Sequence, residues 1–163
     1  YEKRVRWMDE RGVRQWNVTD YLNAYPETYY RRQAEAGNLY VLKETESGTV
    51  IGAVVLLQQD ERWADRSGVS AYYVHNLVTD PAVKGAGAEM LRAIEQMARE
   101  QGKQALRLDC AVDNAFLNRY YESMGYMPAG ECAEGAYRGI RREEIMKSYI
   151  KEKRRRDPAL CDL

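Results

Sequence analysis

The hydrophobic residues recur at two different spacings, which together predict a protein of mixed helices and strands. Apolar residues three and four positions apart, such as Met90, Ile94 and Met97, predict helices in residues 1–12, 26–36, 85–102 and 113–125. Alternating or unbroken apolar runs predict two strands within 38–59, joined by a turn at Glu46–Gly48, and one strand each in 69–80, 103–112, 126–131 and 142–150. The charged segment 60–68 is predicted to be a loop.

The order of these elements predicts an α/β protein of the α+β type, with a mixed central β-sheet flanked by helices. The chain shows no internal repeat and no low-complexity linker. We therefore expect a single domain over residues 1–150, followed by a basic tail over residues 151–163. We interpret the run KEKRRR in that tail as a solvated surface segment.

Composition excludes several classes of function. The 163-residue chain has 25 basic and 25 acidic side chains, and this zero net charge argues against nucleic acid as a main partner. No apolar run approaches the roughly 20 residues that a membrane span needs, and no signal peptide is visible. Three cysteines without CxxC spacing and a single histidine predict a reduced, cytoplasmic protein without a metal site. Because the chain starts at Tyr1 rather than Met, we expect further residues before it in the native protein.

Two glycines lie where the third predicted helix begins, in the stretch TDPAVKGAGAEML. A helix N-terminus has unpaired N–H groups that attract anions, and glycine lets a phosphate approach the backbone closely. Gly85 and Gly87 therefore fit a diphosphate cradle. A tight strand-to-helix turn that needs a positive φ explains the same glycines equally well. The spacing matches neither a P-loop nor the GxGxxG pattern of dinucleotide sites.

The context of the glycines resembles the GNAT superfamily of acetyl-CoA-dependent N-acetyltransferases. The family pattern [RQ]-x-x-G-x-[GA] aligns with residues 82–87, AVKGAG, and the later N…YYExxGF signature aligns with Asn114 and with residues 120–126, YYESMGY. The resemblance covers about residues 69–130, and residues 39–58 more loosely. The second motif, at the expected separation from the first, makes the resemblance specific.

The resemblance implies that acetyl-CoA lies beside a splayed fourth strand of the family fold. The backbone of Leu77, Val78 and Thr79 would pair with the pantetheine arm, and Asn114 would contact that arm. The pyrophosphate would rest on the backbone of residues 83–88, which are Val83, Lys84, Gly85, Ala86, Gly87 and Ala88. The alternatives are a fully paired central strand and, for Asn114, a plain helix cap.

Two departures from the family pattern concern the cofactor and the start of the chain. Ala82 stands where most relatives have Arg or Gln, so one polar contact near the pyrophosphate is absent, although Lys84 offers a positive charge. Family members also begin with a strand and a full helix, whereas Tyr1 lies partway through that helix. The first strand is therefore predicted to be missing from the N-terminus of this sequence, and the alternative is that the edge strand comes from elsewhere.

The resemblance also implies catalytic roles for two residues. Tyr121 matches the usual general acid, a phenol that protonates the departing CoA thiolate, and it fits the motif better than Tyr120. His75 lies two residues before Leu77 and so on the same strand face. A histidine titrates near neutral pH and can accept a proton from an ammonium substrate, directly or through water. A purely structural histidine is the alternative.

The acceptor pocket of this family lies in the segment between the first two helices. Trp16 and Tyr29 fall there, with Tyr73 expected along the channel, and packing onto the sheet is the alternative for each. The same segment contains Tyr21, Tyr25 and Tyr30. It also contains the acidic residues Asp20 and Glu27, which are expected to be solvated, with attraction of a cationic amine as the alternative. The residues do not identify the acceptor.

These inferences predict an N-acetyltransferase that moves acetyl from acetyl-CoA to a primary amine of a small molecule or peptide by direct attack. No acetyl-enzyme is expected, because Cys110 lies in a buried-strand pattern without a basic partner. The alternative is a catalytically silent module that binds an acyl-CoA as a sensor or scaffold. Ala82 favours the module, and the presence of Tyr121 in its motif opposes it. An incompletely covered sheet and many tyrosines are compatible with a homodimer.

Overall fold

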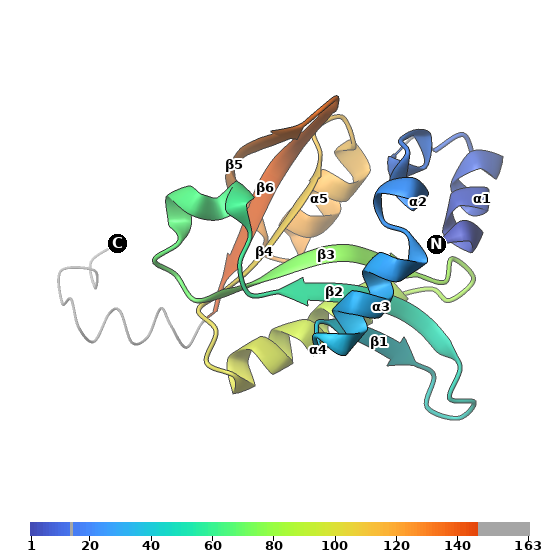
Figure 1. The fold of residues 1–163 in the computed structure, drawn as a ribbon, viewed down its shortest axis with the longest axis horizontal. Coiled ribbons are helices and arrows are strands. Elements are labelled where there is room, and N and C mark those ends of the chain that lie inside the picture. The colour runs from blue at the N-terminus through green and yellow to red at the C-terminus, as the bar shows by residue number, and fades with distance from the viewer. Residues whose placement is uncertain (14, 147–163) are drawn as a thin grey trace. The chain divides into compact units, whose positions relative to one another are not determined.

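The computed structural model describes residues 1–13 and 15–146. It contains a mixed six-stranded sheet with the strand order β1-β2-β3-β4-β6-β5, flanked by helices (Figure 1). The chain divides into two compact units, the first comprising Tyr1–Leu57 and Val74–Ala93, the second Gln58–Tyr73 and the chain from Ile94 onward. Strand β3 (Ala71–Thr79) and helix α4 (Ala86–Glu100) each pass from one unit into the other.

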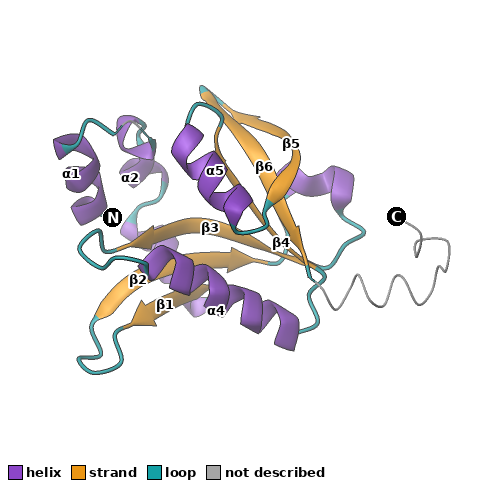
Figure 2. Ribbon diagram, turned by 180° about the vertical axis from the view of Figure 1, so that it is seen from behind, coloured by secondary structure: helices purple, strands orange, loops and turns teal. Residues whose placement is uncertain are grey.

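The first unit is a β-hairpin with helices on it. Its helices are α1 (Glu2–Glu10), the 3-10 helix η1 (Trp16–Val18), α2 (Tyr21–Ala24) and α3 (Glu27–Glu35). Strands β1 (Leu39–Lys43) and β2 (Val50–Leu57) pair antiparallel, with Leu39 opposite Val55. Figures 1 and 2 show α3 and the beginning of α4 on opposite faces of this hairpin. An added Cβ at Gly52 would lie 3.1 Å from the Met90 sulfur, so α4 packs closely over β2 there.

The second unit is built on three strands. Strand β4 (Ala105–Ala111) pairs antiparallel with β6 (Tyr137–Ile145), which in turn pairs with β5 (Met127–Glu134). The first three residues of β3 pair parallel with β4, with Ala71 opposite Ala105. Helix α5 (Ala115–Ser123) connects β4 to β5. The core side chains of this unit include Trp63, Leu106, Leu108, Tyr126 and Met146.

Segment 60–68, predicted as a loop, contains the 3-10 helix η2 (Glu61–Arg66). The prediction was wrong because the apolar anchor of η2 is a single residue, Trp63, which is 1% exposed. The guanidinium groups of Arg107 and Arg141 lie 4.9 Å and 5.0 Å from the centre of its ring, a favourable arrangement for cations on indole.

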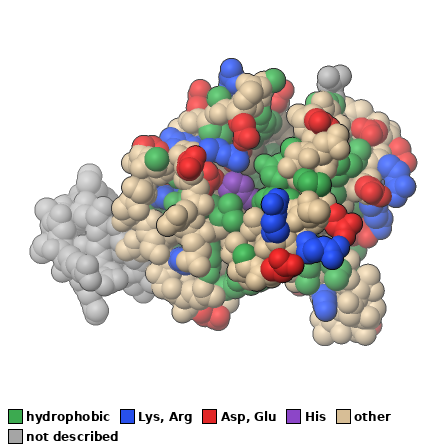
Figure 3. Space-filling view, in the orientation of Figure 1, with side chains coloured by type: hydrophobic (Ala, Val, Ile, Leu, Met, Phe, Trp, Pro, Cys, Tyr) green, Lys and Arg blue, Asp and Glu red, His purple; other side chains and the backbone are tan. Residues whose placement is uncertain are grey.

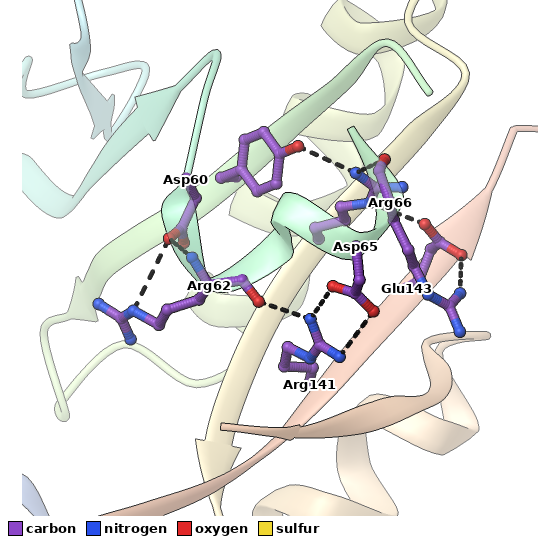
Figure 4. A network of polar contacts seen from close by, with 8 residues as sticks. Asp60, Arg62, Asp65, Arg66, Arg141 and Glu143 are labelled. Atoms are coloured by element: carbon purple, nitrogen blue, oxygen red, sulfur yellow. Dashed lines mark hydrogen bonds and ion pairs between the residues drawn. The ribbon is translucent and has the colours of Figure 1, made fainter. Parts of the chain in front are cut away.

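Ion pairs hold η2 onto β6, as Figure 4 shows. Arg141 binds both carboxylate oxygens of Asp65, and Arg66 donates to Glu143 at 3.0 Å. The fully buried Arg107 donates from Nε to the same Glu143 at 2.7 Å. The charged residues of segment 60–68, which suggested a loop, therefore form the ion pairs that order it.

The predicted elements otherwise agree with the structure to within a few residues. Helix α3 was expected at 26–36 and spans Glu27–Glu35, and the cap of α5 is Asn114, whose side chain accepts from the Leu117 N–H at 3.0 Å. Strand β6 begins earlier than predicted, at Tyr137. The end of that predicted strand beyond Met146 and the tail at 151–163 lie outside the described residues. Acidic and basic side chains are interspersed over the described part of the face in Figure 3, as the zero net charge suggests.

Candidate functional site

Strand β3 contains a residue in the left-handed conformation between two of the predicted site residues. Asn76 has a φ of 51° and is the only residue other than glycine with a positive φ in the described part of the chain. Asn is the residue that tolerates this left-handed conformation best after glycine. Asn76 departs from the extended geometry on which regular alternation depends, and the expectation that His75 and Leu77 share a strand face stays a prediction. Both side chains are half-buried.

The end of β3 is tied to the first helix through Thr79. The Arg4 guanidinium donates to the Thr79 carbonyl oxygen at 2.9 Å and to its hydroxyl oxygen at 3.0 Å. Thr79 is 8% exposed, whereas Leu77 and Val78 are half-buried. Of the three residues predicted to line the pantetheine arm, Thr79 thus has its carbonyl oxygen already engaged within the first unit.

Asp80 organises the turn that leads from β3 to the glycines. Its side chain accepts from the Ala82 N–H at 2.9 Å, and its carbonyl oxygen accepts from the Val83 N–H at 3.1 Å. The Lys3 ammonium forms an ion pair with the same carboxylate. These contacts hold the pKa of Asp80 below its usual value, chiefly through the hydrogen bond from Lys3 and then through the Ala82 N–H. The contacts of Asp80 therefore fix the conformation of the loop before α4.

Gly85 lies immediately before α4, and the space beside its Cα is open. Its φ is 81°, and an added Cβ would meet no protein atom within 4 Å. The Glu89 N–H donates to the Gly85 carbonyl oxygen at 3.0 Å, which makes this the first i to i−4 bond at the start of α4. A helix leaves its leading N–H groups without intrahelical partners, and they carry a partial positive charge.

This segment fits a phosphate group. Val83 and Lys84 are exposed, and a glycine without a Cβ stands next to the helix N-terminus. The positive φ of Gly85 confirms that a tight turn needs glycine here, and the phosphate cradle stays a prediction. Ala82 is exposed, and its N–H is engaged by Asp80.

In the second unit, Tyr121 lies on α5. It is half-buried, its ring centre is 5.6 Å from that of Tyr120 and 6.0 Å from that of Tyr126, and burial raises its pKa above the usual value for a phenol. Tyr121 is therefore protonated at neutral pH, which is the form that a general acid needs.

Helix α5 is fixed by Asn118, a residue that the sequence analysis missed. Its amide nitrogen donates to the Ala111 and Asn114 carbonyl oxygens at 2.9 Å, and its amide oxygen accepts from the buried Arg142 at 3.0 Å. The Cys110 thiol also donates to that oxygen at 3.3 Å. Cys110 is buried, as predicted, and burial raises the pKa of its thiol, so it is a poor nucleophile.

The predicted acceptor residues divide between the two units. In the first unit, Trp16 packs against Tyr21 with ring centres 4.5 Å apart, and the Tyr29 hydroxyl donates to the Asn76 side-chain oxygen at 3.0 Å. Tyr73 is 5% exposed in the second unit, and its hydroxyl oxygen accepts from Arg107 at 2.9 Å. The structure gives Tyr73 a packing role, and its place in an acceptor channel has no structural support.

An open hollow of about 330 Å³ lies beside Trp16 and Tyr21 in the first unit. The residues that line it are Val5, Trp16, Asn17, Thr19, Asp20, Tyr21, Leu22 and Asn23. Asp20 is the one charged residue among them, and its carboxylate accepts from the Asn23 amide at 2.7 Å. The hollow therefore combines aromatic walls with a negative charge, a combination that suits a cationic group.

The described residues contain neither a metal-binding cluster nor a membrane-spanning helix. Residues 1–13 and 15–146 contain no group of three or more His, Cys, Asp or Glu side chains that could hold a metal ion. No helix in the same residues is long and apolar enough to cross a membrane.

Comparisons with known proteins all indicate the same family. Residues 10–126 match the sequence profile of the "Acetyltransferase (GNAT) family". A Bacillus subtilis (strain 168) protein named "Uncharacterized N-acetyltransferase YesJ" is 30% identical over 139 residues, which cover 80% of this chain and 74% of that protein.

Solved structures show the same similarity. A GNAT family acetyltransferase from Listeria monocytogenes 4b F2365 has a TM-score of 0.68 and 26% identity, over 85% of this chain and 81% of the other. A GNAT family acetyltransferase from Elizabethkingia anophelis, solved with acetyl-CoA bound, has a TM-score of 0.55 and 14% identity, over 74% of this chain and 83% of the other. The second likeness concerns the fold alone.

Proposed function

Because the chain belongs to the GNAT acetyltransferase family, we propose that it transfers the acetyl group of acetyl-CoA to a primary amine by direct attack. Acetyl transfer is the general activity of this family. One observation carries the proposal to this chain: the end of β3, which follows the left-handed Asn76, leads through a turn fixed by Asp80 into an open glycine at the start of α4, all within the first unit.

Acetyl-CoA would supply an acetyl group activated as a thioester. The backbone N–H groups of residues 83–88 and the exposed Lys84 would hold its pyrophosphate, since helix N-termini and ammonium groups both favour phosphate. The backbone of Leu77 and Val78 would pair with the pantetheine arm, as an extended edge can. Thr79 is the weaker candidate, because Arg4 already occupies its carbonyl oxygen. Asn114 caps α5, and a contact from it to the arm stays a prediction.

We assign the proton transfers to Tyr121 and His75. The phenol of Tyr121, kept protonated by burial, would donate a proton to the leaving thiolate. His75 would accept the proton of the ammonium acceptor, directly or through water. No acetyl-enzyme forms in this proposal, because the Cys110 thiol is buried and its pKa is raised.

The acceptor is proposed to be a cationic amine of a small molecule or peptide. Support comes from the hollow in the first unit, where Trp16 and Tyr21 stand beside Asp20. A cytoplasmic location is proposed on the free thiols of Cys110 and Cys132, because oxidising compartments favour disulfides. A homodimer stays a prediction.

Calorimetry with acetyl-CoA, followed by a panel of amines with detection of released CoA, tests the proposal. Saturable binding below millimolar concentration together with CoA release on at least one amine is expected. Absence of binding at millimolar acetyl-CoA would contradict the whole proposal. Binding without CoA release on any amine would favour the sensor or scaffold module, for which the missing polar side chain at Ala82 is the supporting feature.

A further inference from the structure

Asn76 is joined to three tyrosines of the first unit, each from a different part of the N-terminal segment. Its side-chain nitrogen donates to the Tyr21 hydroxyl oxygen at 2.7 Å, and its side-chain oxygen accepts from the Tyr29 hydroxyl at 3.0 Å. Its backbone carbonyl oxygen accepts from the Tyr1 hydroxyl. One residue in a left-handed conformation therefore receives contacts from the residue before α1, from α2 and from α3.

The tyrosines are themselves packed into one cluster. The ring centre of Tyr1 lies 5.9 Å from that of Tyr21 and 5.0 Å from that of Tyr30, and Tyr29 lies 5.1 Å from Tyr30. Burial raises the pKa of both Tyr1 and Tyr21, so both hydroxyls stay protonated at physiological pH. The cluster is thus a fixed arrangement of hydroxyl groups around a single amide.

The chemistry of this arrangement explains why the left-handed residue is an asparagine. Glycine would adopt the φ of 51° with less strain, but it has no side chain to bond Tyr21 and Tyr29. Alanine would have neither advantage. An asparagine side chain has a donor nitrogen and an acceptor oxygen, and the structure uses both atoms.

We propose that Asn76 is a positioning residue for acetyl-CoA, which sets the direction of the backbone at Leu77 and Val78 and links it to the wall of the acceptor hollow through Tyr21. The left-handed Asn76 lies immediately before the segment assigned to the pantetheine arm, so its φ helps to determine where the following N–H and C=O groups point. Tyr21 also lines the hollow. The inference rests on the proposed function, because it takes Leu77 and Val78 to be the cofactor edge.

The first test compares Asn76→Gly with the wild type by calorimetry with acetyl-CoA. Glycine keeps the left-handed backbone accessible but removes two hydrogen bonds, so the segment is no longer held in its binding conformation before the cofactor arrives. We expect the affinity for acetyl-CoA to fall roughly tenfold, as the loss of two ordinary hydrogen bonds suggests. Circular dichroism at the same temperature confirms that the variant is folded.

A double-mutant cycle separates positioning from general packing. Tyr21→Phe should weaken acetyl-CoA binding in the wild-type background and should have no further effect in the Asn76→Gly background. Tyr40→Phe, which removes a hydroxyl from another half-buried tyrosine of the first unit, is the control and should leave binding unchanged in both backgrounds. Asn76→Asp, which keeps the acceptor for Tyr29 but loses the donor to Tyr21, should fall between the wild type and Asn76→Gly.

The outcomes distinguish this inference from the proposed function. If the wild type does not bind acetyl-CoA, the proposed function fails. If the wild type binds and folded Asn76→Gly binds equally well, the positioning role is wrong while the proposed function stands. An equal effect of Tyr21→Phe in both backgrounds would also overturn the link through Asn76.

Discussion

Arg4 holds Thr79 through two hydrogen bonds, one to the carbonyl oxygen at 2.9 Å and one to the hydroxyl oxygen at 3.0 Å. The neighbouring Lys3 pairs with Asp80, the next residue along the chain. Helix α1 therefore fixes the end of β3 and the beginning of the turn toward Gly85. In the proposed function, this makes α1 part of the support for the cofactor backbone rather than a peripheral helix.

Arg4→Met should destabilise this connection, because it keeps an unbranched apolar side chain and removes every donor. We expect the free energy of unfolding to fall by about 1–3 kcal/mol, as for hydrogen bonds made by a charged group. Urea denaturation followed by circular dichroism measures the change. Arg6→Met, at an exposed position of the same helix, is the control and should change stability by less than about 0.5 kcal/mol. Equal changes in the two variants would show that the contacts to Thr79 contribute nothing specific.

Gly85→Ala tests whether this position needs glycine for its backbone conformation or for the open space around it. An alanine Cβ would meet no protein atom within 4 Å, but the φ of 81° is unfavourable for it. We expect destabilisation of about 1–2 kcal/mol from the backbone alone. If residues 83–88 also hold a pyrophosphate, the affinity for acetyl-CoA should fall in addition, as measured by calorimetry on the folded variant. Reduced stability with unchanged affinity would leave only the tight-turn role.

Ala82→Arg tests the departure from the family pattern. The side chain of residue 82 is exposed and follows directly after the fixed Asp80 turn, so an arginine can extend there without entering the core. A guanidinium that reaches the pyrophosphate should tighten acetyl-CoA binding by about 1 kcal/mol, or roughly fivefold. Ala36→Arg, at the exposed end of α3, should have no effect and controls for added charge. An unchanged affinity in both variants would place the pyrophosphate elsewhere.

The sequence predicts the regular elements of this fold well because their signals are local. Apolar spacing locates α3, α4 and α5, and the glycine at residue 85 correctly marks the beginning of a helix. Segment 60–68 was the exception. Its order depends on Trp63 and on pairs such as Arg141 with Asp65, whose partners are 76 residues apart in the chain. No local pattern reveals such partners.

The same distinction applies to the site. The motif around Gly85 can be recognised from its local sequence. The hydrogen bonds of Asn76 cannot, because its partners Tyr21 and Tyr29 lie 55 and 47 residues away in the chain. The prediction that His75 and Leu77 share a strand face depends on regular alternation through β3, and the left-handed Asn76 lies between them. An asparagine in the middle of an apolar strand was the one available signal for a left-handed residue.

Asp80 should make the stability of the first unit sensitive to acid. Its pKa is held below the ordinary value of 3.8, first by the hydrogen bond from Lys3 and then by the Ala82 N–H. A carboxylate whose pKa is lower in the folded state stabilises the protein at any pH above its unfolded-state pKa. That contribution is lost as the pH falls through its folded-state pKa. Asp80→Asn should therefore lower Tm near neutral pH and flatten the fall of Tm below about pH 4. Glu35→Gln, at the exposed end of α3, is the control; a similar flattening there would remove Asp80 from the explanation.

Tyr121→Phe should lower kcat by about 10²- to 10⁴-fold, the usual contribution of a general acid, while the affinity for acetyl-CoA stays the same. Tyr120→Phe removes the neighbouring hydroxyl on the same helix and should have a much smaller effect on kcat. Steady-state kinetics with any amine accepted in the panel, together with calorimetry, give both quantities. Equal losses of kcat in the two variants would assign the proton to a different donor.

The pH dependence of the rate provides a separate check on Tyr121. Burial raises its pKa above the ordinary 10.0 of a phenol, and the protonated phenol is the active form. Activity supported by Tyr121 is therefore fully present at neutral pH and is lost only as the pH rises through that raised value. We expect kcat/KM of the wild type to show no decline up to about pH 9.5, whereas an unshifted phenol would already begin to lose its proton there. A decline below about pH 9 that Tyr121→Phe abolishes would mean that the phenol is solvated in the working enzyme, against the burial seen on α5.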